Sequence, residues 1–280
     1  MADQNVCPTD CWRCFMDLFK YPRTPHIRGS RLQKGDEDLE VVRSADLVGK
    51  HLVIEEKVDG ANSGISFDDA GRLYLQSRGH YLMGGPRETQ FTLFKQWAAA
   101  RAEDLLAVLG ERYVAYGEWL YSKHTVFYDQ LPHYWMEFDV LDRARSKAGD
   151  PWFLDTPGRA ALLEGLAYDQ VRVIWSGVWT REMRFEDFIA PSAFKSARWR
   201  DRLASQVESL GQDLALIFKH TDPLDDMEGL YVKWEEEGRV RGRYKFVRKD
   251  FVSLLVDNAT HHLNLPITPN GLAEGVDLFG

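Results

Sequence analysis

Glu56-Lys57-Val58-Asp59-Gly60-Ala61-Asn62 places one lysine between two carboxylates, at the end of an expected strand and just before a turn. The run His51–Val58 has the β-branched character of a strand, and Asn62–Phe67 is the expected return strand, so Asp59-Gly60 is typical of a hairpin turn. Taken alone, the lysine has two interpretations. It is either a solvated ion pair on an edge strand or a chemically active amine, and other parts of the chain must decide.

The remaining patterns predict an α+β fold with antiparallel sheets in its first half and helices in its middle. Period-two and β-branched patterns predict further strands at 72–77, 113–120 and 134–141, and a final hairpin of 229–234 with 240–246, whose Lys and Arg side chains alternate along one face. Helical spacing of apolar residues predicts helices within 89–109, 159–166, 185–188 and 197–210.

Composition and charge exclude several classes of protein. The 280 residues are 44% hydrophobic and 28% charged, which is typical of a globular chain rather than a disordered one. No apolar run reaches the roughly 18 residues of a membrane span, and the start lacks the order of a secretory signal, so we expect a cytoplasmic protein with no membrane partner. The net charge of −8 argues against non-specific binding of nucleic acid, and the local basic stretch Arg239–Lys249 is where we expect phosphate to bind.

The cysteines Cys7, Cys11 and Cys14 form one N-terminal cluster. Their spacing matches the iron–sulfur pattern of radical enzymes that bind S-adenosylmethionine, but no fourth ligand or barrel repeat accompanies it. The favoured interpretation is a terminal segment with reduced thiols, and metal analysis of the purified protein distinguishes the two.

Five further motifs follow the lysine in a fixed order. They are Ser77-Arg78-Gly79, Tyr116-Gly117-Glu118, Glu137-Phe138-Asp139-Val140, Glu228-Gly229-Leu230-Tyr231-Val232-Lys233 and Arg243-Tyr244-Lys245. This order and content resemble the covalent nucleotidyltransferases, the superfamily of ATP-dependent DNA and RNA ligases and mRNA-capping guanylyltransferases. The Lys-x-Asp-Gly-x-Asn form and the short tail after Lys245 are most similar to the phage-type nick-sealing RNA ligases, over about residues 20–251.

The resemblance implies that Lys57 attacks the α-phosphorus of ATP, expels pyrophosphate and holds AMP through a phosphoramide bond. A lysine with a pKa of about 10.4 is almost wholly protonated at neutral pH. We therefore expect nearby cations and burial to lower the pKa of Lys57. Lys233, Arg243 and Lys245 are the expected cations, which would also hold the α-phosphate. Arg243 stands where the family often has a lysine; it keeps the charge and adds bidentate reach to phosphate.

The other roles carry over position by position from the same resemblance. Phe138 would stack on adenine, Glu118 would accept from the ribose hydroxyls, and Arg78 would contact the ribose or the 5′-phosphate. Glu228 would help to hold Mg²⁺ or Mn²⁺ near the α-phosphate. Each has a plainer alternative, since Phe138 is equally well a core residue and Glu118 a partner of a neighbouring base. Positions around the nucleotide and the strand ends are further implied for Glu56, Asp59 and Asn62.

The resemblance therefore predicts an ATP-dependent polynucleotide ligase, acting on RNA ends or a nicked duplex, in a fold whose antiparallel sheets flank a nucleotide-binding cleft. The expected organisation is a lead segment over residues 1–45, an adenylation domain over 46–255 with a helical mid-chain insertion, and a short tail over 256–280. A DNA ligase or a capping-type guanylyltransferase is disfavoured because only 35 residues follow Lys245, too few for an oligonucleotide-binding barrel. A non-catalytic binding module would have little use for Lys57, Glu228 and Lys245 together.

Overall fold

Two β-sheets form the body of the protein in a computed structural model that describes residues 18–32, 35–166, 168–251 and 266–279. The first sheet has the strand order β2 (Val41–Val42), β1 (His26–Ile27), β11 (Arg239–Val247), β10 (Gly229–Glu236), β3 (His51–Lys57) and β9 (Val173–Val178). The second has the order β5 (Leu73–Ser77), β4 (Ala61–Phe67), β6 (Tyr113–Trp119), β7 (Trp135–Asp142) and β8 (Asp169–Gln170). The pairings among β3, β9, β10 and β11, and among β4 to β7, are antiparallel.

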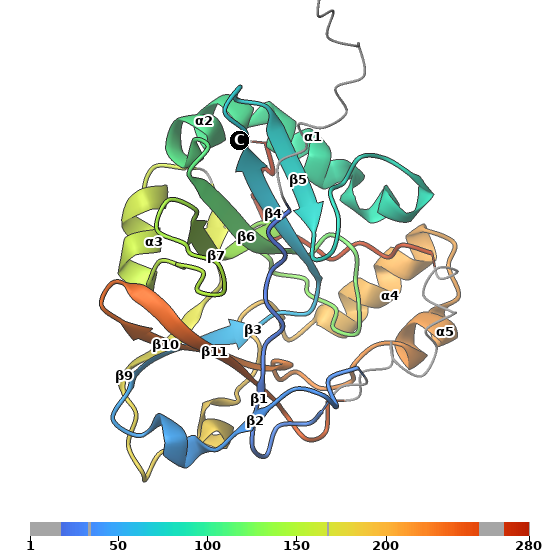
Figure 1. Ribbon diagram of the computed structural model, residues 1–280. Helices are drawn as coiled ribbons and strands as arrows, with labels where there is room; N and C mark the ends of the chain where they lie inside the picture. Colours follow the sequence, from blue (N-terminus) through green and yellow to red (C-terminus); the bar gives the residue numbers. More distant parts are fainter. Residues whose placement is uncertain (1–17, 33–34, 167, 252–265, 280) are drawn as a thin grey trace, which may run out of the picture.

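Helices cover the outer parts of the two sheets (Figure 1). They are α1 (Thr92–Ala100), α2 (Ala102–Leu109), α3 (Thr156–Leu163), α4 (Trp199–Ser209) and α5 (Leu214–Lys219), with 3-10 turns η1 (Ser44–Leu47), η2 (Pro86–Phe91) and η3 (Phe185–Phe188). The apolar face of α1 packs Phe94 and Trp97 against Trp119 and Trp135 of the second sheet. The α+β class expected from the sequence is confirmed.

The hairpin expected across Asp59-Gly60 is wrong. β3 and β4 do not pair with each other: β3 lies in the first sheet between β10 and β9, and β4 lies in the second between β5 and β6. The short link 58–60 therefore carries the chain from one sheet to the other. A side chain at Gly60 would place its Cβ 2.6 Å from the Trp119 carbonyl oxygen, so this glycine allows a close crossing rather than a tight turn.

The middle of the chain is less purely helical than expected. Strand β9, which forms an edge of the first sheet, lies between the helices α3 and α4 and was not predicted. The part of the lead segment that is described supplies β1 and β2, and β1 pairs in parallel with β11 at His26 and Lys245. The helix expected over 89–109 is divided into η2, α1 and α2. The cysteine cluster lies outside the described residues.

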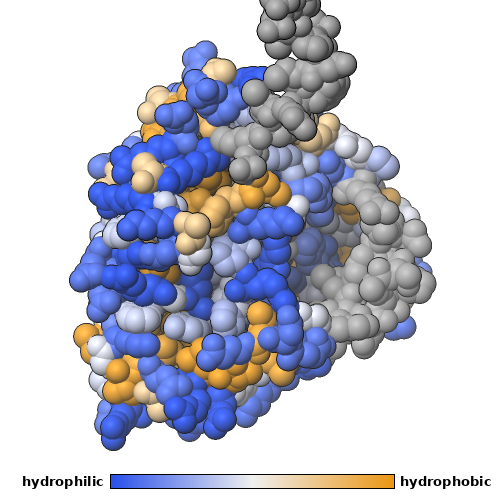
Figure 2. Space-filling model, in the orientation of Figure 1, coloured by the Kyte–Doolittle hydropathy of each residue, from blue (hydrophilic) through white to orange (hydrophobic). Residues whose placement is uncertain are grey.

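The surface visible in Figure 2 is mainly hydrophilic, with separate hydrophobic areas near its lower edge. The exposed apolar side chains of β9, Val173 and Val178, belong to the edge of the first sheet. Within the described residues, no helix has the length and apolar character needed to cross a membrane.

Candidate active site

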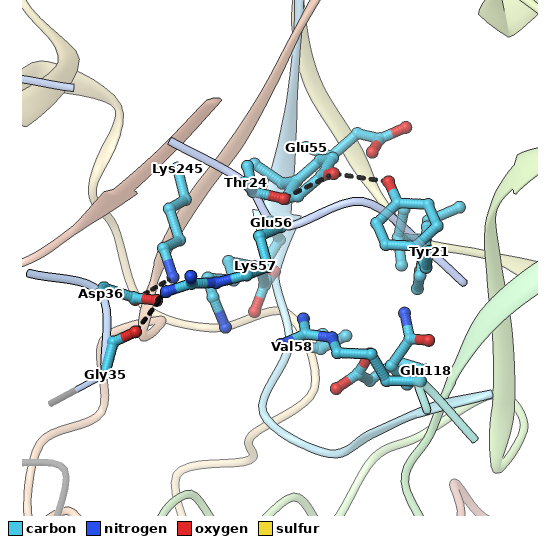
Figure 3. Close-up of a pocket in the computed structure, with 16 residues that line it drawn as sticks. Tyr21, Thr24, Gly35, Asp36, Glu55, Glu56, Lys57, Val58, Glu118 and Lys245 are labelled. Atoms are coloured by element: carbon cyan, nitrogen blue, oxygen red, sulfur yellow. Dashed lines mark hydrogen bonds and ion pairs between the residues drawn. The ribbon is translucent and has the colours of Figure 1, made fainter. Parts of the chain in front are cut away.

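A pocket of about 380 Å³ lies between the two sheets and is lined by residues of both. Figure 3 shows Lys57 inside it, with Asp36 and Lys245 to one side and Glu118 to the other. Of the residues predicted from sequence, the lining contains Glu56, Lys57, Asn62, Arg78, Glu118, Phe138 and Lys245. The motif that begins with Lys57 spans the pocket, because the lysine ends β3 in the first sheet and Asn62 lies on β4 in the second.

Strand register places Glu228 beside Lys57. Gly229 at the start of β10 pairs with Lys57 at the end of β3, so the preceding residue reaches the lysine. The Lys57 ammonium donates to Glu228 Oε2 at 2.7 Å, and the Lys57 side chain is 22% exposed. Glycine is required at 229, since a Cβ there would lie 2.2 Å from the Phe246 carbonyl oxygen. The close packing of β10 on β11 thus helps to hold the ion pair in place.

The expectation of a lowered pKa for Lys57 is wrong for the protein's own groups. Burial lowers this pKa, but the carboxylates of Glu228, Glu118 and Asp59 outweigh burial and raise it above its ordinary value. The expected cations do not balance these carboxylates, because two of them lie elsewhere. Burial is also the main reason that the pKa of Glu228 is raised to about 7, against the opposing effect of Lys57.

Glu118 and Asn62 face each other across β4 and β6 and line the same end of the pocket. Glu118 accepts a hydrogen bond from the Gly60 backbone N–H at 3.2 Å. Burial raises the pKa of Glu118 to about 7, although Lys57 and Arg78 act in the opposite direction. Asn62 Oδ1 is buried and has no hydrogen-bond partner among the described residues, which leaves it available to a donor in the pocket.

Phe138 is a core residue that also lines the pocket, and its predicted stacking on adenine stays a prediction. It belongs to the core between the sheets, where its ring meets Tyr21 edge to face at 5.2 Å and Tyr231 at 6.2 Å. It also lines the pocket and is 8% exposed. The aromatic wall formed by Tyr21, Phe138 and Tyr231 offers an apolar surface to a flat ring.

Lys233 and Arg243 lie beneath the pocket and do not belong to its lining. The Lys233 ammonium pairs with Glu55 Oε1 at 2.8 Å and lies 3.5 Å from Asp139 Oδ1, and Arg243 Nε donates to Asp139 Oδ2 at 2.7 Å. Burial would raise the pKa of Asp139, but Arg243 and Lys233 lower it to about 2. These two cations therefore neutralise carboxylates that join the sheets.

A further buried arginine extends this ion network. Arg159 on α3 donates to both carboxylate oxygens of Glu137 at 3.0 Å and to Glu55 Oε1 at 2.9 Å, and all three side chains are fully buried. Because Glu55 lines the pocket, α3 helps to fix one polar side chain of its wall. Neither Arg159 nor Glu55 was predicted from the sequence to have a role.

Most of the basic stretch expected to bind phosphate is neutralised by carboxylates. Five of its cations form ion pairs, namely Arg239 with Asp150, Arg241 with Glu237, Arg243 with Asp139, Lys245 with Asp36 and Arg248 with Asp222. Among the three cations of the predicted phosphate site, only Lys245 lines the pocket. Lys245 Nζ lies 2.5 Å from Asp36 Oδ2, and burial lowers its pKa, against the opposing effect of Asp36.

Glu56 and Asp59 make contacts that organise the chain around the pocket. The Glu56 carboxylate accepts from Ser192 Oγ at 2.5 Å and from the Ala193 N–H at 3.3 Å, so its side chain turns away from that of Lys57 along β3. Asp59 Oδ2 accepts the backbone N–H groups of Thr125 at 2.7 Å and Val126 at 2.9 Å. Their predicted nucleotide contacts stay predictions.

The donor set suits a divalent cation that is shared with a ligand. No group of three or more His, Cys, Asp or Glu side chains gathers as a metal site within the described ranges. Mg²⁺ is commonly bound by one or two carboxylates together with substrate phosphates and water, rather than by a complete protein cage. Glu228 fits that requirement, because it is a buried carboxylate that lies beside Lys57 at the pocket.

Several lining residues were not predicted, namely Tyr21, Arg23, Thr24, Asp36, Glu55 and Tyr231. The sequence did contain a usable signal for two of them. Glu55 lies two residues from Lys57 on β3, and Tyr231 lies two residues from Lys233 on β10, so each shares a strand face with a predicted site residue. Tyr21, Arg23, Thr24 and Asp36 carried none. They reach the pocket through the pairing of β1 with β11, a contact between distant parts of the sequence.

Comparison with known proteins identifies the family. A family model described as RNA ligase matches residues 50–247, which include every motif from Lys57 to Lys245. The chain belongs to the RNA ligase family. No curated protein matches it.

Three solved structures illustrate the likeness at low identity. A mutant RNA ligase from Naegleria gruberi, solved with ATP and Mn, is 14% identical, with 73% of this chain and 51% of that chain covered and a TM-score of 0.45. Another mutant of that ligase, solved with AMP and Mn, is 14% identical, with 82% and 62% covered and a TM-score of 0.46. An archaeal ATP-dependent RNA ligase is 16% identical, with 73% and 44% covered and a TM-score of 0.43. The chain spans about half the length of the first of these.

Proposed function

We propose that this protein is an ATP-dependent polynucleotide ligase that joins a 5′-phosphate to a 3′-hydroxyl, with RNA as its substrate. The observation that carries the proposal is the position of Lys57, whose amine enters a pocket of about 380 Å³ between the two sheets, 2.7 Å from Glu228. Family membership supports strand joining as the overall activity. The pocket supports a nucleotide as the first substrate, since it combines an aromatic wall, cations and hydrogen-bonding groups.

The proposed first step transfers AMP to Lys57. The lone pair of the Lys57 amine forms a bond to the α-phosphorus of ATP, and the bond from that phosphorus to the bridging oxygen breaks, so that pyrophosphate leaves with the electron pair. The ammonium must lose one proton to solvent before or during attack. In the second step a strand 5′-phosphate displaces Lys57 and takes up AMP, and in the third a 3′-hydroxyl displaces AMP.

The lining residues suit distinct parts of the nucleotide. Phe138 and Tyr231 would stack on the base, Asn62 and Glu118 would bond the sugar or phosphate region, and Arg78 and Lys245 would neutralise phosphate charge. Glu228 is the carboxylate that would hold Mg²⁺ or Mn²⁺ together with phosphate oxygens. The metal would supply charge neutralisation at the α-phosphate. Lys233 and Arg243 act in this proposal by fixing Glu55 and Asp139 beneath the pocket.

A sealing assay tests the function. Purified protein, Lys57→Ala and the control Lys50→Ala, which changes a lysine outside the pocket lining, are incubated with ATP, Mg²⁺ and a nicked RNA duplex. Wild type and Lys50→Ala should seal the nick, and Lys57→Ala should lose sealing by a factor of about 10³ or more because the nucleophile is absent. Parallel reactions with nicked DNA, single-stranded RNA and GTP define the substrates. Equal sealing by Lys57→Ala would contradict the proposal.

A further inference from the structure

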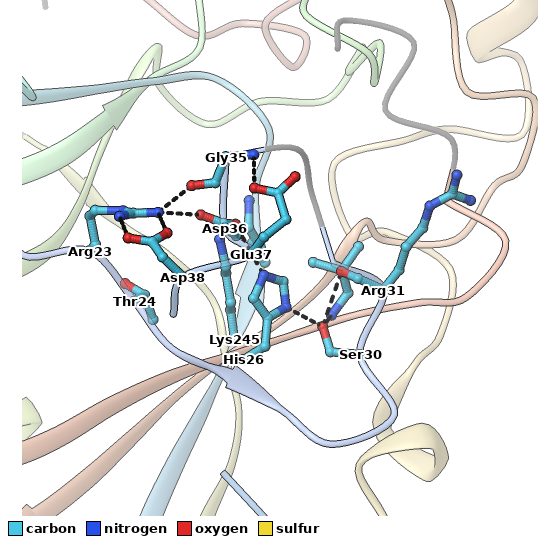
Figure 4. Close-up of polar contacts among 12 residues, drawn as sticks. Arg23, Thr24, His26, Ser30, Arg31, Gly35, Asp36, Glu37, Asp38 and Lys245 are labelled. Carbon is cyan, nitrogen blue, oxygen red and sulfur yellow. Dashed lines mark hydrogen bonds and ion pairs between the residues drawn. The ribbon is translucent and has the colours of Figure 1, made fainter. Parts of the chain in front are cut away.

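Four residues form a cluster at the edge of the pocket that the motif roles do not explain. This Asp36 cluster consists of Arg23, His26, Asp36 and Lys245 (Figure 4). Asp36 Oδ2 lies 2.5 Å from Lys245 Nζ and 3.1 Å from His26 Nε2, and Arg23 Nη2 lies 3.5 Å from Asp36 Oδ1. The Asp36 carboxylate thus lies between the Lys245 ammonium and the His26 imidazole. Arg23 stands beside them and is held mainly by Asp38, with Nη1 2.7 Å from Asp38 Oδ2 and Nη2 2.8 Å from Asp38 Oδ1.

Backbone pairing fixes the cluster on the first sheet. His26 of β1 pairs in register with Lys245 of β11, and the Lys245 N–H donates to the Pro25 carbonyl at 2.9 Å. His26 Nδ1 is hydrogen-bonded to Ser30 Oγ at 2.7 Å, which sets the direction of its ring. His26 and Lys245 are therefore held independently of Asp36, whereas Arg23 is held by Asp38 and the Gly35 carbonyl, which lie with Asp36 on the connection between β1 and β2.

The position that the Asp36 carboxylate occupies borders the pocket. Arg23, Asp36 and Lys245 all line it, together with Lys57, and the Asp36 side chain is 15% exposed. A carboxylate brings a single negative charge and two oxygens to these donors. A phosphate group brings more charge and three terminal oxygens, and an arginine fork can engage two of them at once. The donors that now meet the carboxylates of Asp36 and Asp38 are therefore of the kind that binds a phosphate group.

We infer that Arg23, His26 and Lys245 form the seat of the β- and γ-phosphates of the nucleotide, and that Asp36 occupies this seat until the triphosphate displaces it. The inference rests on the proposed function and adds to it the part of the pocket that receives the leaving group. When the bond between the α-phosphorus and the bridging oxygen breaks, the new negative charge stays on pyrophosphate. Fixed cations at the seat stabilise that charge.

The inference separates the steps of the reaction. Transfer of AMP from ATP to Lys57 and its reversal by pyrophosphate both involve the β- and γ-phosphates. Joining of a strand that already carries AMP involves neither phosphate. A residue that serves only the seat therefore affects the first two processes and leaves the third intact.

The test compares Arg23→Gln with Arg198→Gln, a matched change of an arginine that is 80% exposed and outside the pocket lining. Labelling by α-labelled ATP and release of the label by inorganic pyrophosphate should each slow by about tenfold in Arg23→Gln, as expected for loss of a charged phosphate contact. Sealing of a pre-adenylylated RNA strand should stay within about twofold of wild type in both variants. Equal losses in all three assays, or none, would overturn the inference.

Two binding measurements test the phosphate seat without relying on catalysis. Inorganic tripolyphosphate, titrated calorimetrically into the full chain, should bind about tenfold more weakly to Arg23→Gln than to Arg198→Gln. Asp36→Asn should bind it more tightly than wild type, because the competing charge is gone. Weaker binding by Asp36→Asn would make Asp36 part of the ligand site and overturn the inference. Tripolyphosphate binding with this pattern, in a protein that takes no label from ATP, would contradict the proposed function alone.

Discussion

At the scale of single residues, Lys57 lies near carboxylates whose charged forms are disfavoured by burial. Burial raises the pKa of Glu118 and of Glu228 to about 7, while both groups help to raise the pKa of Lys57. The ammonium is thus the favoured form of Lys57 among the protein's own charges. In the proposed mechanism, ligand binding must change this balance before the Lys57 amine can attack.

The variant Glu118→Gln tests how much the charged form of Glu118 lowers the free energy of unfolding. The folded-state pKa of about 7 exceeds the ordinary value of 4.5, so the stability that Glu118 contributes is fully present below pH 4.5 and is lost as the pH rises through 7. At pH 8 the folded protein carries a half-buried charge that glutamine removes. We expect Glu118→Gln to gain about 1 kcal/mol relative to wild type at pH 8, or roughly 2–4 °C in Tm, and less at pH 5.

Thermal unfolding at the two pH values measures this effect. Glu111→Gln, which changes an exposed glutamate just before β6, serves as the control and should shift neither Tm. A Glu118→Gln protein that is less stable at pH 8 than at pH 5, each compared with wild type, would show that the Glu118 charge is favourable.

At the scale of elements, the link between β3 and β4 determines where the pocket forms. Asp59 accepts two backbone N–H groups, and Gly60 passes close to the Trp119 carbonyl, so three residues suffice to carry the chain between sheets. Sequence patterns predicted β3 and β4 because their side chains alternate and are β-branched. They did not predict that the strands belong to different sheets, since Asp-Gly is equally typical of a hairpin turn.

Two glycines are expected to be irreplaceable for steric reasons. A Cβ at Gly60 would meet the Trp119 carbonyl oxygen at 2.6 Å, and one at Gly229 would meet the Phe246 carbonyl oxygen at 2.2 Å. Gly60→Ala and Gly229→Ala should each lower the free energy of unfolding by about 2–3 kcal/mol, because the backbone that the new methyl group meets must shift. Gly79→Ala is the matched control, since nothing lies within 4 Å of its Cβ position. Urea denaturation measures all three, and equal stability would refute the steric account.

The site was partly predictable at this scale. Residues inside the ordered motifs, such as Lys57, Glu118 and Lys245, do line one pocket, because each motif carries its own strand pattern. The burial of Lys233 and Arg243 against Asp139 was not predictable, since sequence spacing does not show which carboxylate a cation meets. The same holds for Asp36, which lies 209 positions from Lys245 along the chain.

At the scale of the whole molecule, the acidic net charge and the neutralised basic stretch limit how the protein can hold nucleic acid. The chain has a net charge of −8, and five cations of 239–249 are paired with carboxylates. Arg78 and Lys245 line the pocket, and Lys245 can meet a phosphate there only if it parts from Asp36. Binding of a strand end is therefore expected to depend on few contacts.

The salt dependence of RNA binding measures that number. A plot of the logarithm of the association constant for a 5′-phosphorylated single-stranded RNA against the logarithm of salt concentration should have a slope of about −2 to −3, corresponding to a few phosphates. Fluorescence anisotropy at several salt concentrations gives the slope. A slope near −7 corresponds to about ten phosphates. It would contradict this account, because it requires many more cations in contact with RNA than the few that line the pocket.

In the proposed mechanism the amine of Lys57 carries AMP. The most direct test of this step is to incubate the protein with ATP and Mg²⁺, digest it, and locate the AMP adduct by peptide mass spectrometry. The account predicts a single adduct on the peptide that contains Lys57, lost in Lys57→Arg and kept in Lys50→Arg. An adduct on another lysine, or no adduct in a protein that nevertheless seals RNA with ATP, would contradict it.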